Sequence, residues 1–166
     1  MPVEFDITLT SDDMYRFNMY QTYSGFHGIF SIVIAILIFV MAAVTFGQAE
    51  LMYTVIYVIF GIVFLFYSPV TLYLHAKRNI ARSEVLSKSL HYHVDEENGF
   101  TVSQDGESAN LPWKQIYKMV ATKSNVLVYS NRTNAYVIPR AQLGDNYEAL
   151  AALANKQLEK FRVKMK

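Results

Sequence analysis

Cysteine is absent from the chain. Zero cysteines among 166 residues exclude disulfide bonds, thiolate nucleophiles and zinc sites built from thiolates. The sequence also lacks a phosphate-binding glycine loop, a nucleophile elbow and a zinc-peptidase motif. Since no nucleophile, metal cluster or acid–base pair stands out, we expect the chain not to be an enzyme and to need no cofactor.

Charge is missing from two long apolar runs, Ile29 to Phe46 and Leu51 to Leu74. A helix of about 20 residues crosses a bilayer core of about 30 Å, so each run is long enough to span. The second run is too long and too apolar for a buried hairpin of a soluble protein to be a good alternative. Acidic residues precede the first run, which is therefore interpreted as a retained span rather than a signal peptide. The sequence predicts a transmembrane hairpin over 26–74, with helices at about 27–46 and 51–74.

Basic residues flank this hairpin on one side. Lys77, Arg78, Arg82 and Lys88 follow the second run closely, whereas the turn between the runs offers only Glu50. By the positive-inside rule, both termini should be cytoplasmic in a multi-pass protein of the cell membrane. The lipid bilayer is thus the first expected partner. The formal net charge of +1 gives no reason to expect a nucleic-acid partner.

The two apolar runs contain residues that affect helix packing and bending, but not the charged residues that a transport pathway usually needs. Acids and bases are absent, and hydroxyl groups such as those of Thr45 and Thr71 can bond to the preceding helical turn. Pro69 should kink or terminate the second helix, and a hinge is the alternative. Small residues at four-residue spacing would allow close packing within the hairpin or in a homo-oligomer. This spacing is found in Ser31 with Ala35 and in Ala43 with Gly47.

The N-terminal region, residues 1–25, is predicted to contain a strand and an interfacial helix. Apolar and polar residues alternate from Val3 to Leu9, the period of a half-buried strand. Thr10 or Ser11 can cap an aromatic helix, and Thr10 with Asp13 resembles a capping box. This helix should lie in the headgroup region or pack on the cytoplasmic domain. Because a strand cannot stand alone, residues 3–9 should complete a sheet built by the C-terminal part.

Residues 75–88 are predicted to continue the second span as a basic helical linker. From Ser89 the apolar period changes to two, and Asn98-Gly99 and Asp105-Gly106 are typical turn sequences. Short strands at this spacing predict a small antiparallel sheet or open barrel. Region 89–166 should therefore form one cytoplasmic α+β domain.

A C-terminal helix is expected to cover this sheet. Asp145 is the predicted cap, and an apolar face is formed by Leu150, Ala154, Leu158 and Phe161.

One strand carries a candidate cluster of metal-binding side chains. His91, His93 and Asp95 should project from the same side of this strand. Two histidines without a clear third and fourth ligand fall short of a tetrahedral site, so a solvated strand face is the preferred interpretation and no metal is predicted. Trp113 is expected to anchor the core, with stacking on a ligand as the alternative.

Basic residues on both sides of this domain are candidate contacts with an anionic membrane surface. A solvated helix end is the alternative interpretation for those at the C-terminus. The candidates are Lys77, Arg78, Arg82, Lys88, Lys160, Arg162, Lys164 and Lys166.

The succession of these features resembles a known family. Gly99-Phe100, Trp113 with Ile116, and Ile138-Pro139-Arg140 follow a two-span hairpin, a combination similar to the YcxB-like proteins of bacterial membranes. The resemblance implies a C-terminal domain similar to bacterial pleckstrin-homology-like modules. It implies no catalytic residues.

Two classes of function fit these features. The preferred hypothesis is a membrane-tethered binding or regulatory module whose domain docks a protein partner at the inner membrane surface. The alternatives are a domain that recognises anionic lipid directly and a membrane self-protection (immunity) protein, the latter by fold-level analogy alone. The turn Asp95-Glu96-Glu97-Asn98 argues against lipid recognition, because it is acidic where phosphoinositide readers carry basic residues.

Overall fold

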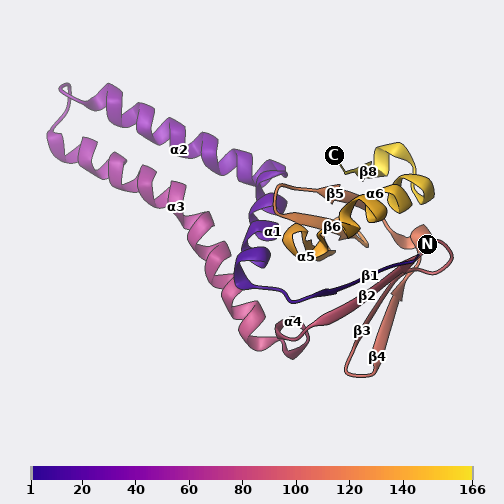
Figure 1. Cartoon of the computed structure of the whole chain (residues 1–166). Coiled ribbons are helices and arrows are strands. Elements are labelled where there is room, and N and C mark those ends of the chain that lie inside the picture. The colour runs from indigo at the N-terminus through magenta and orange to yellow at the C-terminus, as the bar shows by residue number, and fades with distance from the viewer. Residues whose placement is uncertain (1, 166) are drawn as a thin grey trace. The chain divides into compact units, whose positions relative to one another are not determined.

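The computed structural model describes residues 2–165. The chain forms two compact units: unit 1 comprises Met1–Phe17 and Lys77–Lys166, and unit 2 comprises Asn18–Ala76. Unit 1 is therefore built from both ends of the chain, and the segment between them forms unit 2 (Figure 1).

Unit 2 is a helical hairpin. Helix α2 (Phe26–Thr45) and the first part of helix α3 (Leu51–Arg82) lie side by side and antiparallel (Figure 1). Both helices are long and apolar enough to cross a membrane, and large apolar side chains are exposed along both. The prediction of two long apolar helices joined by a short turn is confirmed.

Small residues allow the two helices of unit 2 to pack closely. Ala35, Ala42 and Gly61 are buried, and a Cβ atom on Gly61 would lie 2.8 Å from the ring of Phe39. Ala43 is exposed, so the second predicted pair of small residues does not lie on this buried face. Ala42, one position before Ala43, lies on the buried face. It shares this face with Ala35 because the two residues are seven positions, or about two helical turns, apart.

Helix α3 continues past Pro69 and ends at Arg82, so the helix does not terminate at the proline. The expected continuous helix over 75–88 is interrupted at Ser83, whose backbone is extended. The Ser83 hydroxyl accepts a hydrogen bond from Leu86 N at 3.3 Å and caps the short helix α4 (Glu84–Ser87).

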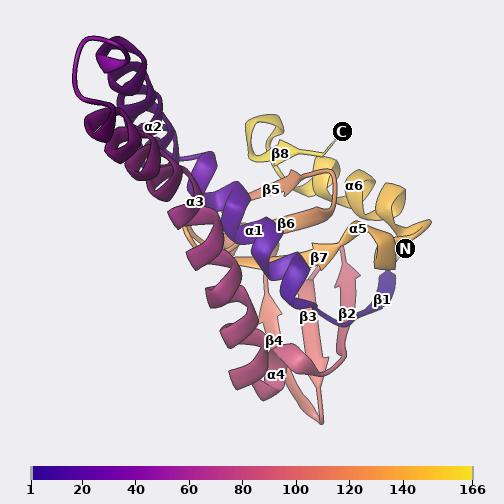
Figure 2. The same cartoon turned by 90° about the vertical axis from the view of Figure 1, so that its left-hand side faces the viewer.

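The first sheet of unit 1, sheet A, includes the N-terminal strand. Its order is β1 (Val3–Ile7), β2 (Leu90–Asp95), β3 (Gly99–Gln104) and β4 (Glu107–Leu111), with antiparallel pairing throughout (Figure 2). Phe5 lies opposite Tyr92, and their rings stack with centroids 5.3 Å apart. The predicted pairing of the N-terminal strand with the C-terminal part is confirmed.

The second sheet, sheet B, has the order β7 (Ala135–Pro139), β6 (Asn125–Tyr129), β5 (Lys118–Ala121) and β8 (Val163–Lys164). Strand β8 pairs with β5 in parallel, which sequence reasoning did not predict. Unit 1 thus contains two small sheets and covering helices, which is the expected α+β mix, whereas the sequence predicted one small antiparallel sheet or open barrel.

Helix α1 (Ser11–Tyr23) begins with the predicted capping box. Thr10 N donates to Asp13 Oδ2 at 3.1 Å, and Asp13 N donates to Thr10 Oγ1 at 3.2 Å. This reciprocal pair satisfies two donors at the start of the helix. It also sets the direction in which the chain leaves β1.

Helices α5 (Arg140–Leu143) and α6 (Asn146–Gln157) pack against β1. Asp145 occupies the predicted N-cap position of α6, but its side chain makes no capping hydrogen bond. The predicted end of the helix is wrong. Leu158 is buried in extended backbone beyond α6, and Phe161 is 75% exposed in the 3-10 turn η2 (Lys160–Arg162). The chain leaves the helix there because Val163 pairs beside Met119 of β5.

Candidate functional site

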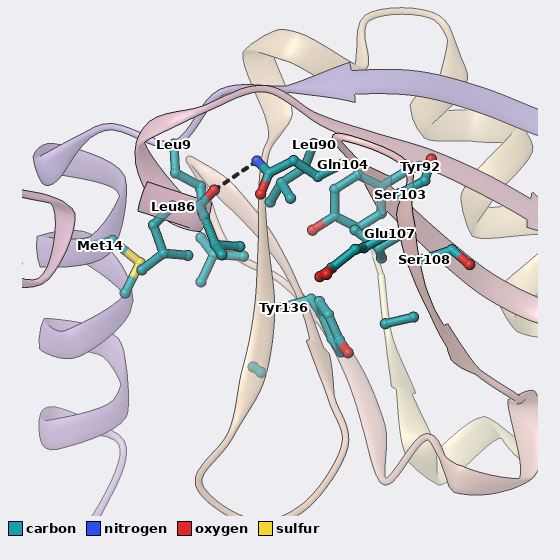
Figure 3. A pocket seen from close by; sticks show the side chains of 15 residues that line it. Leu9, Met14, Leu86, Leu90, Tyr92, Ser103, Gln104, Glu107, Ser108 and Tyr136 are labelled. Atoms are coloured by element: carbon teal, nitrogen blue, oxygen red, sulfur yellow. Dashed lines mark hydrogen bonds between the residues drawn. The ribbon is translucent and has the colours of Figure 1, made fainter. Parts of the chain in front are cut away.

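An apolar groove opens at one edge of unit 1. It has a volume of about 410 Å³ and lies between β4, an edge strand of sheet A, and β7, an edge strand of sheet B (Figure 3). We call this space the edge groove. Its lining residues are Leu9, Met14, Val85, Leu86, Leu90, Tyr92, Val102, Ser103, Gln104, Glu107, Ser108, Ala109, Ala135, Tyr136 and Val137.

The apolar lining of the edge groove comes from the inner faces of both sheets. Leu90 and Val102 of sheet A and Val137 of sheet B are buried and line it. One end is closed by Met14 of α1 and Leu86 of α4 (Figure 3). Binding sites of this kind are mostly apolar with a few polar groups that set orientation.

Tyr92, Glu107 and Tyr136 supply the polar groups. Figure 3 shows their side chains converging on the middle of the groove. Tyr92 is 1% exposed, and burial raises the pKa of its hydroxyl, with a smaller contribution from Tyr136. Within residues 2–165, neither tyrosine hydroxyl forms a hydrogen bond to another side chain or backbone group. Both therefore remain available as donors to a ligand.

Strand β4 presents a free edge beside the groove. The β3–β4 turn consists of Asp105 and Gly106, both with positive φ, and Gln104 pairs with Glu107 across it. In a two-residue hairpin the flanking pair is hydrogen-bonded, and hydrogen-bonded and non-bonded pairs then alternate. The backbone N–H and C=O groups of Ser108 consequently point away from β3, toward the open edge.

The rim of the groove is acidic. Lys88 Nζ contacts Asp105 Oδ2 at 2.6 Å, which neutralises one carboxylate near the β3–β4 turn. Glu107 lines the edge groove, and together with Glu84 it lines a second depression beside the groove; neither carboxylate has a cationic partner among the described residues. The net charge at the rim is therefore negative and favours a ligand with a cationic group.

The wall between α4 and β3 is held by Gln104. Its Nε2 donates to Val85 O at 2.9 Å and to Ser89 O at 3.2 Å. The carbonyls of Val85 in the short helix α4 and of Ser89 in the loop after it thereby gain a hydrogen-bond partner, and α4 stays beside the groove.

The candidate metal cluster lies elsewhere, on the outer face of sheet A. His91 Nδ1 is 2.8 Å from Asp6 Oδ1, and His93 Nδ1 is 2.8 Å from Glu4 Oε1. Asp95 Oδ2 is 3.4 Å from His93 Nε2. The three predicted residues thus share one face, but the histidines pair across to β1 rather than forming a purely solvated face.

Asp95 also organises the turn after β2. Its carboxylate accepts hydrogen bonds from the backbone N–H groups of Asn98 and Glu97, and these, Asn98 foremost, hold its pKa below the usual range. Glu96 in the same turn pairs with Lys156, which lowers the pKa of the Glu96 carboxyl. The acidic turn is therefore tied to α6.

Trp113 lies in the core. It is 6% exposed, its Nε1 donates to Asp95 O at 2.8 Å, and its ring meets Phe100 edge-on with centroids 5.5 Å apart. Gly99 makes room for this segment, because a Cβ atom there would lie 2.4 Å from Leu111 O and 2.9 Å from Trp113 N. This burial leaves Trp113 no open ring face for a ligand.

The predicted membrane-contact residues form two separate groups. Lys77, Arg78 and Arg82 lie on the last turns of α3, shortly before α4. The other group lies on η2 and β8, and Figures 1 and 2 both place α4 and the C-terminal end far apart within unit 1. That second group consists of Lys160, Arg162 and Lys164, while Lys166 lies outside the described residues.

Sequence reasoning missed the edge groove. The sequence feature that points to the groove is the composition of β4, Glu107–Leu111, which lacks the alternation of apolar and polar residues seen in β2. Four of the five residues of β4 are exposed. A strand of that kind is typical of a sheet edge. The apposition of β4 and β7 depends on how the two sheets pack, which no local pattern reports.

The chain was compared with protein families, curated proteins and solved structures. Residues 96–154 match the family model described as YcxB-like protein. No curated protein and no solved structure matches the chain. The matched segment runs from the turn after β2 into α6 and includes β3, β4 and β7, the strands that frame the edge groove. The predicted resemblance to the YcxB-like family is thus confirmed over residues 96–154.

Proposed function

We propose that the chain is a membrane-anchored docking module. In this proposal α2 and α3 cross the cell membrane as a hairpin, both termini are cytoplasmic, and unit 1 binds a protein partner at the inner surface. The exposed apolar side chains of both helices support the membrane placement, because such surface is unfavourable in water. Lys77, Arg78 and Arg82 against the lone Glu50 support the orientation.

Unit 1 is proposed to be pleckstrin-homology-like. The succession of four antiparallel strands, three further antiparallel strands and a covering helix supports this assignment. An unusual feature would be that the first strand, β1, precedes the membrane hairpin. The two ends of the hairpin would then both be tied to the same domain.

The partner is proposed to bind as an extended segment along β4. A free strand edge offers backbone hydrogen bonds, and a neighbouring pocket takes alternate side chains of the added strand. The free edge of β4 beside the edge groove is the observation that carries this proposal. Apolar side chains of the segment would contact Leu90 and Val137, and a Lys or Arg would contact Glu107.

The acidic rim also decides between partner classes. A phosphate headgroup at Glu107 in the groove, or at Glu84 in the depression beside it, would meet like charge, which is unfavourable. A peptide with a basic residue gains at the same positions. The groove therefore favours a protein segment over an anionic lipid.

A photo-crosslinking experiment tests this function. Benzoyl-phenylalanine replaces Ala109 in the groove or, as matched control, Thr101 on the outer face of neighbouring β3, in the full chain in native membranes. A protein captured from Ala109 and not from Thr101 is expected. Equal capture from both positions would contradict the proposal.

Two substitutions at one position sharpen the result. Ser108→Pro removes the outward N–H of β4 without removing a bond to β3, whereas Ser108→Ala keeps it. Capture from Ala109 should fall about tenfold in the proline variant, the equivalent of about 1.4 kcal/mol, and stay unchanged in the alanine variant. Capture that ignores both substitutions would rule out strand addition.

A further inference from the structure

We infer that the C-terminal turn of unit 1 is a second membrane-contact surface, which binds an anionic bilayer through an exposed aromatic pair set among cations. This inference rests on the anchoring of the hairpin proposed above. It concerns Tyr117, Phe161 and the cations Lys160, Arg162 and Lys164. We call this set the tail patch.

The aromatic pair is exposed, whereas unit 1 buries most of its large apolar side chains; Val85 on α4 is another exposed one. Phe161 is 75% exposed and Tyr117 is 45% exposed. Arg162 Nε donates to Tyr117 O at 3.1 Å, so the turn that carries Phe161 is held beside Tyr117. Exposed aromatic side chains that a structure holds in place are typical of contact surfaces.

The charges around this pair are mostly positive. Lys160, Arg162 and Lys164 alternate with Phe161 and Val163 along the chain, and Glu159 is the one acidic residue within this stretch of the sequence. The nearby Lys156 is already paired with Glu96 and is not counted in the patch. The net charge of the tail patch is therefore positive.

An anionic bilayer is the partner that fits both properties. Aromatic rings lie at the headgroup level, and cations are attracted to anionic lipid over a Debye length of about 8 Å. A hairpin in the membrane would tether unit 1 to the same bilayer. A soluble acidic protein would supply the charge but would not be tethered in this way.

The position of the patch leaves the edge groove open. In sheet B, β8 lies at one edge and β7 at the other. A bilayer that contacts η2 and β8 therefore does not occupy the edge beside β7, where the partner segment is proposed to bind. Membrane contact and partner docking can occur together, and the contact would fix how unit 1 presents the groove.

The test uses the full chain in lipid nanodiscs. Because the chain has no cysteine, a single environment-sensitive fluorophore can be attached at Phe161→Cys, at Ser108→Cys as an extramembrane control, or at Val58→Cys within α3. Quenching by nitroxide-labelled lipid reports immersion. The discs contain phosphatidylcholine alone or with about 30% phosphatidylglycerol at low and high salt.

The expected result is quenching of the probe at position 161 by about twofold in anionic discs at low salt, and little quenching in neutral discs or at high salt. Adding Lys160→Gln, Arg162→Gln and Lys164→Gln to Phe161→Cys should abolish it. The Ser108→Cys probe should not be quenched under any of these conditions.

Several outcomes would overturn the inference. If the probe at position 161 is not quenched in anionic discs while the probe at Val58→Cys is, the tail patch does not contact the membrane, although the hairpin is anchored in it. Absence of quenching at Val58→Cys contradicts the anchoring itself. A blue shift at position 161 without quenching indicates that the patch meets a second copy of the chain instead of lipid.

Discussion

His93 Nδ1 lies 2.8 Å from Glu4 Oε1, so a side chain that follows the apolar hairpin contacts one that precedes it. His91 and Asp6 repeat this relationship two residues away on the same face. Both pairs join β1 to β2 on the exposed side of sheet A, where an ion pair contributes only about 0–1 kcal/mol. The buried side of β1 must therefore hold the strand in place.

We predict that Phe5→Ala lowers the free energy of unfolding of unit 1 by about 3–5 kcal/mol, because the ring is buried and stacks on Tyr92. Glu4→Gln is the matched control on the other face of the same strand and should cost less than about 1 kcal/mol. Thermal unfolding of the full chain in detergent measures both. Equal effects of the two substitutions would show that β1 is not held by its buried face.

The two turn glycines separate steric clash from backbone strain. Gly99 has φ +86° and a Cβ atom there would lie 2.4 Å from Leu111 O, whereas Gly106 has φ +88° and open space. Gly106→Ala should cost about 1–2 kcal/mol from its left-handed conformation alone. Gly99→Ala should cost clearly more, because Trp113 and its neighbours must move. Denaturant unfolding of the full chain compares them, and a larger effect at Gly106 would contradict the packing described for Trp113.

The acid sensitivity of unit 1 should depend on Asp95. Backbone hydrogen bonds, chiefly from Asn98, lower the pKa of this carboxyl in the folded chain. Its stabilising contribution is therefore present above the unfolded pKa of about 3.9 and is lost as pH falls through the lower folded pKa. Asp95→Asn should flatten the fall in melting temperature below about pH 4. Glu97→Gln is the control, because it removes one negative charge from the same turn but leaves the Asp95 carboxylate in place to accept from Asn98 N–H. This variant should therefore show nearly the same fall in melting temperature as the unchanged chain.

The orientation of the hairpin is open to direct labelling. A cysteine at Ala49, in the turn between α2 and α3, should react with a membrane-impermeant maleimide in intact cells. A cysteine at Ser108 should react only after the membrane is permeabilised. The reverse pattern would place unit 1 outside the cell and overturn the proposed topology.

Local patterns in the sequence determined the elements of this protein well. The uncharged runs predicted both long helices, the alternation from Val3 to Leu9 predicted β1, and Thr10 with Asp13 predicted the start of α1. Each of these signals depends on residues close together in the chain, since helix period, strand period and capping act over a few residues. Even the need for a partner for β1 followed, because a lone strand is unstable.

Tertiary structure alone decided the features on which the proposed function depends. Phe161 continues the apolar period of α6, yet it is exposed because Val163 pairs with the edge of β5 and draws the chain out of the helix. The edge groove likewise exists because β4 and β7, which are edge strands of the two sheets, lie on either side of it. Pairing of strands and packing of sheets join residues far apart in the chain, and several arrangements satisfy the same local periods. The sequence by itself therefore determined the two long helices, β1 and the start of α1, because those signals are local. The strand pairings that set the sheet edges, and with them the candidate site and the end of α6, were decided only by the tertiary structure.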